Sequence, residues 1–347
     1  MGMRTYILRR LLLAIPVLLG AVIFLFAVIQ FIPPLTRATL YITNPKEAKY
    51  ITQIAKENGL FDPVYVQFYY WLKALLIDHN LGIDSSGMPV LQALLMRFPA
   101  TFEIVLYSAP LIILVGLYLG VLAGSNKDKF ADQASRVLAI MGTSLPSFWF
   151  GIVLLAIFYA GLGWFPPGRW VSGGAVNLYI TAPHTPWHWY TGLVTIDALL
   201  NGQLWIFVDG IRHLVLPVTV LVLLNSALLV RVTRSSMLEA LGKDYITAAK
   251  AKGLSRKEVI NIHARRNALI PAITISGLMV AGLLTGVVIT ETVFNMGGIG
   301  QYAATSATAL DIPPVIGYTL LSAVLFVFSN LIVDVLYAYI DPRIRLG

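Results

Sequence analysis

Residues 9–34 read RRLLLAIPVLLGAVIFLFAVIQFIPP, two arginines followed by an apolar stretch that Gln30 alone interrupts before Ile32. About 20 such residues are needed for a helix to cross the hydrocarbon layer of a membrane, so this stretch predicts a spanning helix. Its basic start resembles a secretory signal peptide, but the stretch is longer and lacks a small-residue cleavage site before its end. We therefore expect a retained membrane anchor.

The composition of the whole chain indicates a polytopic integral membrane protein. Of its 347 residues, 57% are hydrophobic and only 12% are charged, and the mean hydropathy is +0.77. Average proteins carry about 25% charged residues. The formal net charge of +8 is divided among short segments between apolar stretches, which argues against a nucleic-acid-binding face. The chain has no cysteine, so disulfides and thiolate chemistry are excluded.

Six stretches meet or approach the length of a membrane span. We place them at 10–32, 101–124, 137–163, 211–231, 268–291 and 314–340. The predicted fold class is an all-α polytopic membrane protein with six transmembrane helices. We divide the chain first into residues 1–32, which hold the N-terminus and the first span. Residues 33–99 are predicted to form an external helical segment, because apolar residues recur at helical spacing in DPVYVQFYYWLKALL (62–76).

Basic residues predict the orientation of the spans. Of the 25 Lys and Arg residues, 17 fall at the termini and in alternate loops on one side, including nine from Arg231 to Arg266, and eight fall on the other side. Cytoplasmic loops are enriched in Lys and Arg. We therefore predict a multi-pass protein of the cytoplasmic (inner) cell membrane. Both termini and the 231–266 region face the cytoplasm.

A second outer region, about 164–210, is rich in aromatic residues: Trp164, Trp170, Trp187, Trp189, Tyr190 and Trp205. Trp and Tyr favour headgroup depth, so we interpret them mainly as an interfacial belt; a docking or substrate-guiding surface is the alternative. His184 and His188 lie in the same region, but Pro183 and Pro186 prevent a helical pair and no third ligand is evident. We predict no metal site there.

Small and polar residues inside the spans indicate a packed, moving bundle. Gly116, Gly120 and Gly124 recur at four-residue spacing, as do Gly282 and Gly286, and such spacing lets helix backbones approach closely. Polar side chains in lipid face the bundle interior. The candidates for lining a pathway, or for hydrogen bonds between helices, are Asn225, Ser276, Thr285, Thr290, Glu291 and Asn330.

Residues 244–271, DYITAAKAKGLSRKEVINIHARRNALIP, form a basic run between two spans. SRKE (255–258) is a capping box, as is SMLE (236–239), and Gly253 can close a helix. The pattern predicts a helix, a tight turn and a second helix, with Leu254 at the tip. Four cations surround that tip: Lys250, Lys252, Arg256 and Lys257. We expect an apolar knob that enters a groove of another protein; a solvated loop or a contact with anionic lipid is the alternative.

The run from Glu239 to Leu278 resembles the EAA loop of binding-protein-dependent ABC importer permeases, in particular the dipeptide/oligopeptide permease family. The resemblance extends in order through RRLLLAIPVLLG (9–20), NGLFDPVYVQFYYWLKALL (58–76), LPSFWFGIVLL (145–155), ETVFNMGGIGQY (291–302) and VDVLYAYIDPRIR (333–345). Thr247 stands before Ala248 and Ala249 where the general pattern has Glu, as is usual in the peptide branch. FIPPLTR (31–37) departs from the family where many members have Pro-Gly-Asp-Pro.

The resemblance implies a type I ABC importer permease, with residues 100–347 as the transmembrane domain and 232–268 as the cytoplasmic coupling loop. Its implied partners are a second homologous permease, two cytoplasmic ABC ATPases, an extracellular solute-binding protein and the lipid bilayer, with no nucleic acid. The chain itself would bind no cofactor, because ATP and Mg belong to the ATPases. The implied ATPase-coupling residues are Asp244, Thr247, Ala248, Ala249, Lys252, Gly253, Leu254 and Ser255.

The implied function is ATP-driven import of di- and oligopeptides, with oligosaccharides or nickel as alternative cargo for the same machinery. No GxxxxGK[ST] phosphate loop is present, so the chain is not expected to hydrolyse ATP by that route. A membrane hydrolase is disfavoured because the sequence has no GxSxG motif. An ATP-independent carrier is the less favoured alternative, since no inverted repeat is evident.

Overall fold

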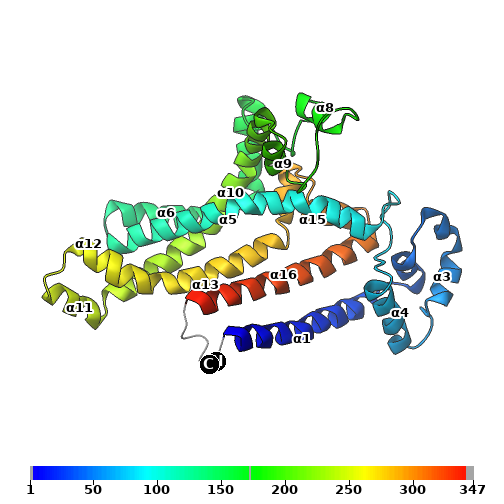
Figure 1. Ribbon diagram of the computed structural model, residues 1–347, viewed down its shortest axis with the longest axis horizontal. Helices are drawn as coiled ribbons and strands as arrows, with labels where there is room; N and C mark the ends of the chain where they lie inside the picture. Colours follow the sequence, from blue (N-terminus) through cyan, green and yellow to red (C-terminus); the bar gives the residue numbers. More distant parts are fainter. Residues whose placement is uncertain (1–2, 172, 341–347) are drawn as a thin grey trace. The chain divides into compact units, whose positions relative to one another are not determined.

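The computed structural model describes residues 3–171 and 173–340 (Figure 1). These residues are organised in helices, and the only extended pairing within them is an isolated bridge between Ile83 and Pro89. The predicted DPRIR tail (341–345), with Arg343 and Arg345, lies outside the described residues. Two compact units can be distinguished: unit 1 comprises residues up to 102, 191–193 and 284 onward, and unit 2 comprises 103–190 and 194–283.

Five helical stretches in the described residues are long and apolar enough to cross a membrane. They are Ile7–Ile29 in α1 (Met3–Ile29), α5 (Val90–Ser125), α10 (Leu204–Leu241), Arg256–Leu284, and Ile312–Val335 in α16 (Ile312–Ile340). The prediction of an all-helical, multi-pass membrane protein is confirmed. Helices α5 and α10 begin before the predicted starts at 101 and 211, and their first turns contribute buried residues such as Leu94 and Ile206 to hydrophobic clusters.

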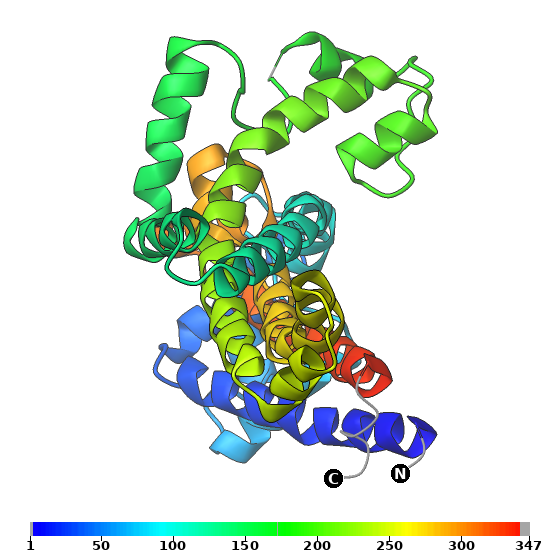
Figure 2. The same cartoon turned by 90° about the vertical axis from the view of Figure 1, so that its left-hand side faces the viewer.

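The predicted third span, 137–163, is a pair of helices joined at a sharp bend. Helix α6 (Phe130–Ser144) ends before Leu145, and α7 (Ser147–Leu154) continues as a π-helical turn over Leu155–Gly161 after a bend of 103°. Pro146 is the N-cap of α7, and proline disfavours helical geometry in the residue before it. Figure 2 shows the bend, with α7 in green.

Unit 1 contains the segment predicted to lie outside the membrane. Short helices follow α1 there: α2 (Pro34–Arg37), η1 (Ala38–Tyr41), η2 (Pro45–Tyr50), α3 (Ile51–Glu57) and α4 (Val64–Leu76). The Trp71 side chain is buried, and its ring lies 5.5 Å from that of Phe26 on α1. The segment therefore shares a hydrophobic core with the end of α1.

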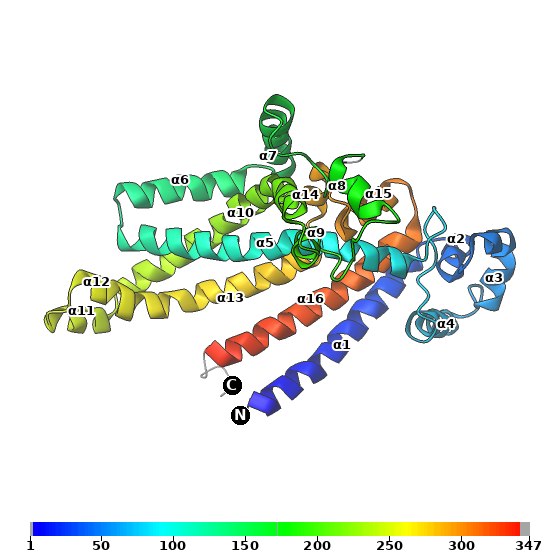
Figure 3. The same cartoon turned by 45° about the horizontal axis from the view of Figure 1, so that its top comes forward.

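The remaining helices of unit 1 follow the last residue of α13. They are α14 (Val288–Phe294), α15 (Ile299–Thr308) and α16. Helices α1 and α16 lie side by side (Figure 3, blue and red). Arg10 Nη1 and Asp334 Oδ2 form an ion pair of 2.9 Å between these two helices.

In unit 2, glycines allow α5 and α10 to approach each other closely. A Cβ added at Gly116, Gly120 or Gly124 would lie 2.4 or 2.5 Å from the Cβ of Leu229, Thr233 or Met237, respectively. Contacts that short do not occur between real carbon atoms, so only glycine fits. The predicted role of this glycine row in helix contact is confirmed.

The 164–210 region, which belongs to unit 2 apart from 191–193, contains a small hydrophobic core. It carries α8 (Ala175–Thr181) and α9 (Val194–Leu200) before α10 begins. Trp187 is buried in that core, whereas Trp164 and Trp189 are about half exposed. Buried Glu103 on α5 fixes the region, because its carboxylate accepts hydrogen bonds from Thr195 and pairs with Arg169 at 3.2 Å.

Candidate functional site

The basic run folds into a helical elbow, defined here as residues 244–258. Helix α11 (Asp244–Ala251) is followed by a turn at Gly253 and then by α12 (Arg256–Glu258), which continues through a π-helical turn (Val259–Ala264) into α13 (Arg265–Leu284). Gly253 has a φ of +76°, a left-handed conformation that favours glycine. The predicted helix, glycine turn and helix are confirmed.

One of the two predicted capping boxes forms. The Glu258 carboxylate accepts a hydrogen bond of 2.8 Å from the Ser255 amide, and the Glu258 amide donates to Ser255 Oγ at 3.3 Å. The other, SMLE, does not start a helix, because α10 runs through Ser236 to Leu241 without a break. Met, Leu, Glu and Ala are strong helix formers, so the helix continues past a serine that resembles a cap.

The elbow is stabilised by its own hydrophobic core. Ile246 and Ala249 of α11 pack with Val259 and with Met237 of α10, all of them buried. Leu254 follows the Gly253 turn, as predicted, and is half-buried against this cluster; its entry into a groove of another protein stays a prediction. The residue after a helix-closing glycine commonly folds back onto the preceding helix, which accounts for its position.

The outward face of the elbow is formed by small and basic residues instead. Of the predicted coupling residues, Ala249 is buried and Leu254 half-buried, and the rest are exposed: Asp244, Thr247, Ala248, Lys252, Gly253 and Ser255. Lys250, Arg256 and Lys257 are also exposed. Before α11, Lys243 pairs with Glu239 at 2.9 Å, and this hydrogen bond raises the pKa of the lysine. The face is therefore a basic surface with little side-chain bulk at Ala248.

The elbow is joined to the turn between α5 and α6. Arg256 Nη2 donates a hydrogen bond of 2.7 Å to the Ser125 carbonyl oxygen, at the last residue of α5. All of these residues belong to unit 2. The elbow is thus hydrogen-bonded to the end of a helix long enough to span a membrane.

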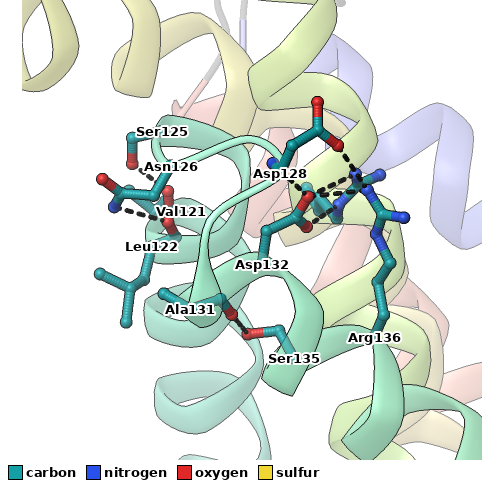
Figure 4. Close-up of polar contacts among 10 residues, drawn as sticks. Val121, Leu122, Ser125, Asn126, Asp128, Ala131, Asp132, Ser135 and Arg136 are labelled. Carbon is teal, nitrogen blue, oxygen red and sulfur yellow. Dashed lines mark hydrogen bonds and ion pairs between the residues drawn. The ribbon is translucent and has the colours of Figure 1, made fainter.

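A buried carboxylate stabilises the same turn (Figure 4). Asp132 is fully buried at the start of α6, where it accepts hydrogen bonds from the Asp128 amide at 3.0 Å and from Arg136 at 2.8 Å. Arg234 of α10 adds a two-point contact, with Nη2 at 3.0 Å from Oδ2. Sequence reasoning missed this group, although an acidic residue four before Arg136 in a basic loop was the available signal.

The predicted pathway residues make separate, local contacts. In unit 2, Asn225 is half-buried and donates to the Leu221 carbonyl, and buried Ser276 donates to that of Ala272, each at 2.8 Å. In unit 1, the Thr285 carbonyl accepts from Ser322, and Thr290 is buried in α14. Asn330 lies in α16. Each hydrogen bond satisfies a polar group that would be costly in lipid.

Glu291 was predicted to lie within the fifth span, but α13 ends at Leu284 and Glu291 belongs to α14. Its buried carboxylate accepts hydrogen bonds from Thr101 at 2.7 Å and from the Gln301 amide at 2.8 Å, so it caps α15. A Cβ at Gly298 would lie 2.5 Å from this carboxyl group. The contact explains the residue pattern of ETVFNMGGIGQ as a structural motif.

Among the residues that the structure describes, no group of three His, Cys, Asp or Glu side chains could hold a metal ion. The contacts around the elbow serve to orient helices and present a surface. The site thus combines a multi-pass helical body with a structured basic elbow tied to helix ends.

Such a body and elbow define a multi-pass helical membrane protein, and comparison with known families shows to which family it belongs. Residues 116–346 match the family described as binding-protein-dependent transport system inner membrane component, and residues 3–114 match the N-terminal region of such components. The chain belongs to this family of transport permeases.

Three relatives show how far the similarity extends. The chain is 36% identical to the oligopeptide transport system permease protein AppB of Bacillus subtilis over 99% of its length and 100% of the relative. It is 37% identical to the di/tripeptide permease DppB of Pseudomonas aeruginosa, with 99% of each chain covered. It is 38% identical to the probable D,D-dipeptide permease DdpB of Escherichia coli, over 86% of this chain and 85% of the relative.

Proposed function

We propose that this chain is the permease subunit of an ATP-driven importer of di- or oligopeptides. The names of its relatives support peptides as the cargo. It would form half of the translocation pathway beside a second, homologous permease, and an external solute-binding protein would deliver the peptide. The chain is non-catalytic in this scheme, and partner ATPases bind and hydrolyse Mg-ATP.

The structure of the elbow supports the proposal that two cytoplasmic ATPases drive the transport cycle. Its Gly253 turn, capping box and separate core make it a rigid projection rather than a flexible loop. The excess of basic residues supports a cytoplasmic position for the elbow and for both termini. An ATPase that closes on nucleotide would move α11 and α12, and Arg256 would transmit the movement to α5, switching the permease between two states.

Substitutions on the outward face of the elbow test this coupling. Ala248→Trp adds bulk to an exposed position and leaves the elbow core intact, so it should reduce ATPase copurification and peptide uptake at least about tenfold, a loss of roughly 1.4 kcal/mol of binding. Gly253→Val should act similarly, because β-branched residues disfavour positive φ. Ala175→Trp, at an exposed position of α8, is the matched control. Normal copurification and uptake in both elbow variants would overturn the proposal.

The cargo path is a second part of the proposal, and the absence of cysteine makes it easy to test. We assign Asn225 and Thr285 to the lining, since both are half-buried, and we assign support of the lining to the buried Ser276, Thr290 and Glu291. Single cysteines at positions 225 and 285 should react with a membrane-impermeant thiol reagent during transport, and peptide should slow the reaction. A cysteine at position 290 should stay unreactive. Equal labelling at all three positions would contradict the assignment.

A further inference from the structure

Helices α1 and α16 run side by side (Figure 3). The seam between them contains two hollows, both within unit 1. The larger, about 560 Å³, is lined on α1 by residues from Ala21 to Ile29, and the smaller, about 180 Å³, by residues from Arg10 to Val17. These α1 residues recur at intervals of three or four, so both hollows follow one helix face. Together they form an interrupted groove along the seam.

The two hollows differ in chemistry. The larger is almost entirely apolar. The smaller has apolar walls, including Leu13 and Phe326, and a polar end formed by Arg10, Asn330 and Asp334. The Arg10–Asp334 ion pair is accessible, with 40% and 27% of the two side chains exposed. A molecule in the smaller hollow would therefore meet a cation, an anion and an amide within a few ångströms of apolar surface.

Asn330 indicates that the smaller hollow lacks a hydrogen-bond donor. Its Oδ1 atom is buried and has no hydrogen-bond partner among the described residues. A buried acceptor without a donor is costly, particularly at membrane depth. The Asp334 carboxylate beside it is a second acceptor. The complementary ligand thus carries N–H groups, preferably on a cation, together with an anion for Arg10.

The position of the polar end fits a lipid headgroup. Arg10 lies close to the start of the span Ile7–Ile29, and Asp334 close to the end of the span Ile312–Val335. Both residues therefore belong at the interface between hydrocarbon and headgroups. At 1.5 Å per residue, the groove extends about 16 Å from Arg10 to the beginning of the larger hollow, which suits an acyl chain.

We propose that the seam binds one phospholipid with a primary-amine headgroup. Its phosphate contacts Arg10, its ammonium group donates to Asn330 Oδ1 and to Asp334, and an acyl chain follows the apolar walls toward the larger hollow. This inference is independent of the cargo and of the coupling role of the elbow.

Competition between lipids with the same acyl chains tests the proposal. The full-length permease is reconstituted in vesicles of equal parts phosphatidylethanolamine, phosphatidylcholine and phosphatidylglycerol, gently extracted, and weighed by native mass spectrometry. Phosphatidylcholine has the same net charge as phosphatidylethanolamine but no N–H donor. We expect phosphatidylethanolamine to be retained about tenfold over phosphatidylcholine, a factor that one hydrogen bond to a charged group supports.

Variants show which residues cause the preference for phosphatidylethanolamine over phosphatidylcholine. Asn330→Leu and Asp334→Asn should reduce it toward unity, while Thr319→Val, which alters the larger hollow only, should retain it. Equal retention of the two zwitterionic lipids by the wild type would mean that water or any acyl chain fills the hollow, and would overturn the proposal. Preferential retention of phosphatidylglycerol, or an unchanged preference in both polar variants, would overturn it as well. The wild-type comparison decides the question even if a variant fails to insert.

Discussion

The contact between α5 and α10 and the seam between α1 and α16 join apolar helices in opposite ways. Glycines at 116, 120 and 124 bring the backbones of the first pair into close contact, beside a hollow of about 300 Å³ where α5 and α10 meet α6. Larger side chains separate the second pair enough to leave a hollow of about 560 Å³. In lipid, helices associate through close packing rather than through the hydrophobic effect. The glycine row of the first contact therefore leaves no room for another molecule, whereas the hollows along the second are suited to one.

Polar groups differ between the two contacts in the same way. Asp132, beside the glycine-packed helices, has every oxygen occupied by arginine or backbone donors. Asn330, in the seam, has an acceptor without a donor among the described residues. Satisfied buried groups rigidify a structure, whereas unsatisfied ones indicate a missing partner. Substitutions of Asp132 and Asn330 can therefore distinguish a satisfied buried group from an unsatisfied one.

The largest expected effect comes from Asp132→Asn. Two partly exposed guanidinium groups would face a neutral amide, and each hydrogen bond to a charged group contributes about 1.5–3 kcal/mol. Thermal unfolding of the purified protein should shift to clearly lower temperature. Glu239→Gln, which breaks the exposed pair with Lys243, is the control and should leave the transition unchanged. Similar transitions for both variants would show that the Asp132 cluster is not a stabilising centre.

A smaller effect is expected from Gly120→Ala, which tests the close packing directly. The new methyl group would meet Thr233 at 2.4 Å, and overpacking of this kind costs about 1–3 kcal/mol. Gly20→Ala in α1 is the matched control, since a Cβ there has nothing within 4 Å. The unfolding temperature should fall for the first variant and hold or rise slightly for the second. Equal tolerance of both would contradict the comparison.

The smallest effect concerns the unpaired amide. In lipid-free detergent, Asn330→Leu removes a buried, unsatisfied acceptor and should raise the free energy of unfolding by about 1 kcal/mol. Added phosphatidylethanolamine should stabilise the wild type more than the variant, so the difference should shrink. Thermal unfolding with and without the lipid measures both values. A variant less stable than the wild type in lipid-free detergent would mean that Asn330 has a partner within the protein.

Local chemistry accounts for what could be predicted from the sequence. The apolar runs, the Ser255–Glu258 cap and the Gly253 turn depend on residues close together in the chain, and all three were predicted. The SMLE cap failed because helix propensity outweighed a single serine. The partial burial of Leu254 could not be predicted, because it depends on Ile246 and Ala249, which pack beneath it.

Contacts distant in sequence could not be predicted in the same way. Asp132 meets Arg234 across 102 positions, and Thr101 meets Glu291 across 190. Neither pair has a local signature, because a hydrogen bond depends on where two helices bring their side chains and not on the spacing along the chain.

The sequence by itself determined the membrane class, the number of apolar stretches, the elbow and the family, since hydrophobic length, caps and motifs are local properties. Only the tertiary structure decided which polar groups are satisfied and which helices pack closely. Burial, hollows and hydrogen-bond partners arise when segments far apart in the chain come together, and so the Asn330 acceptor and the groove beside it became visible only in the folded protein.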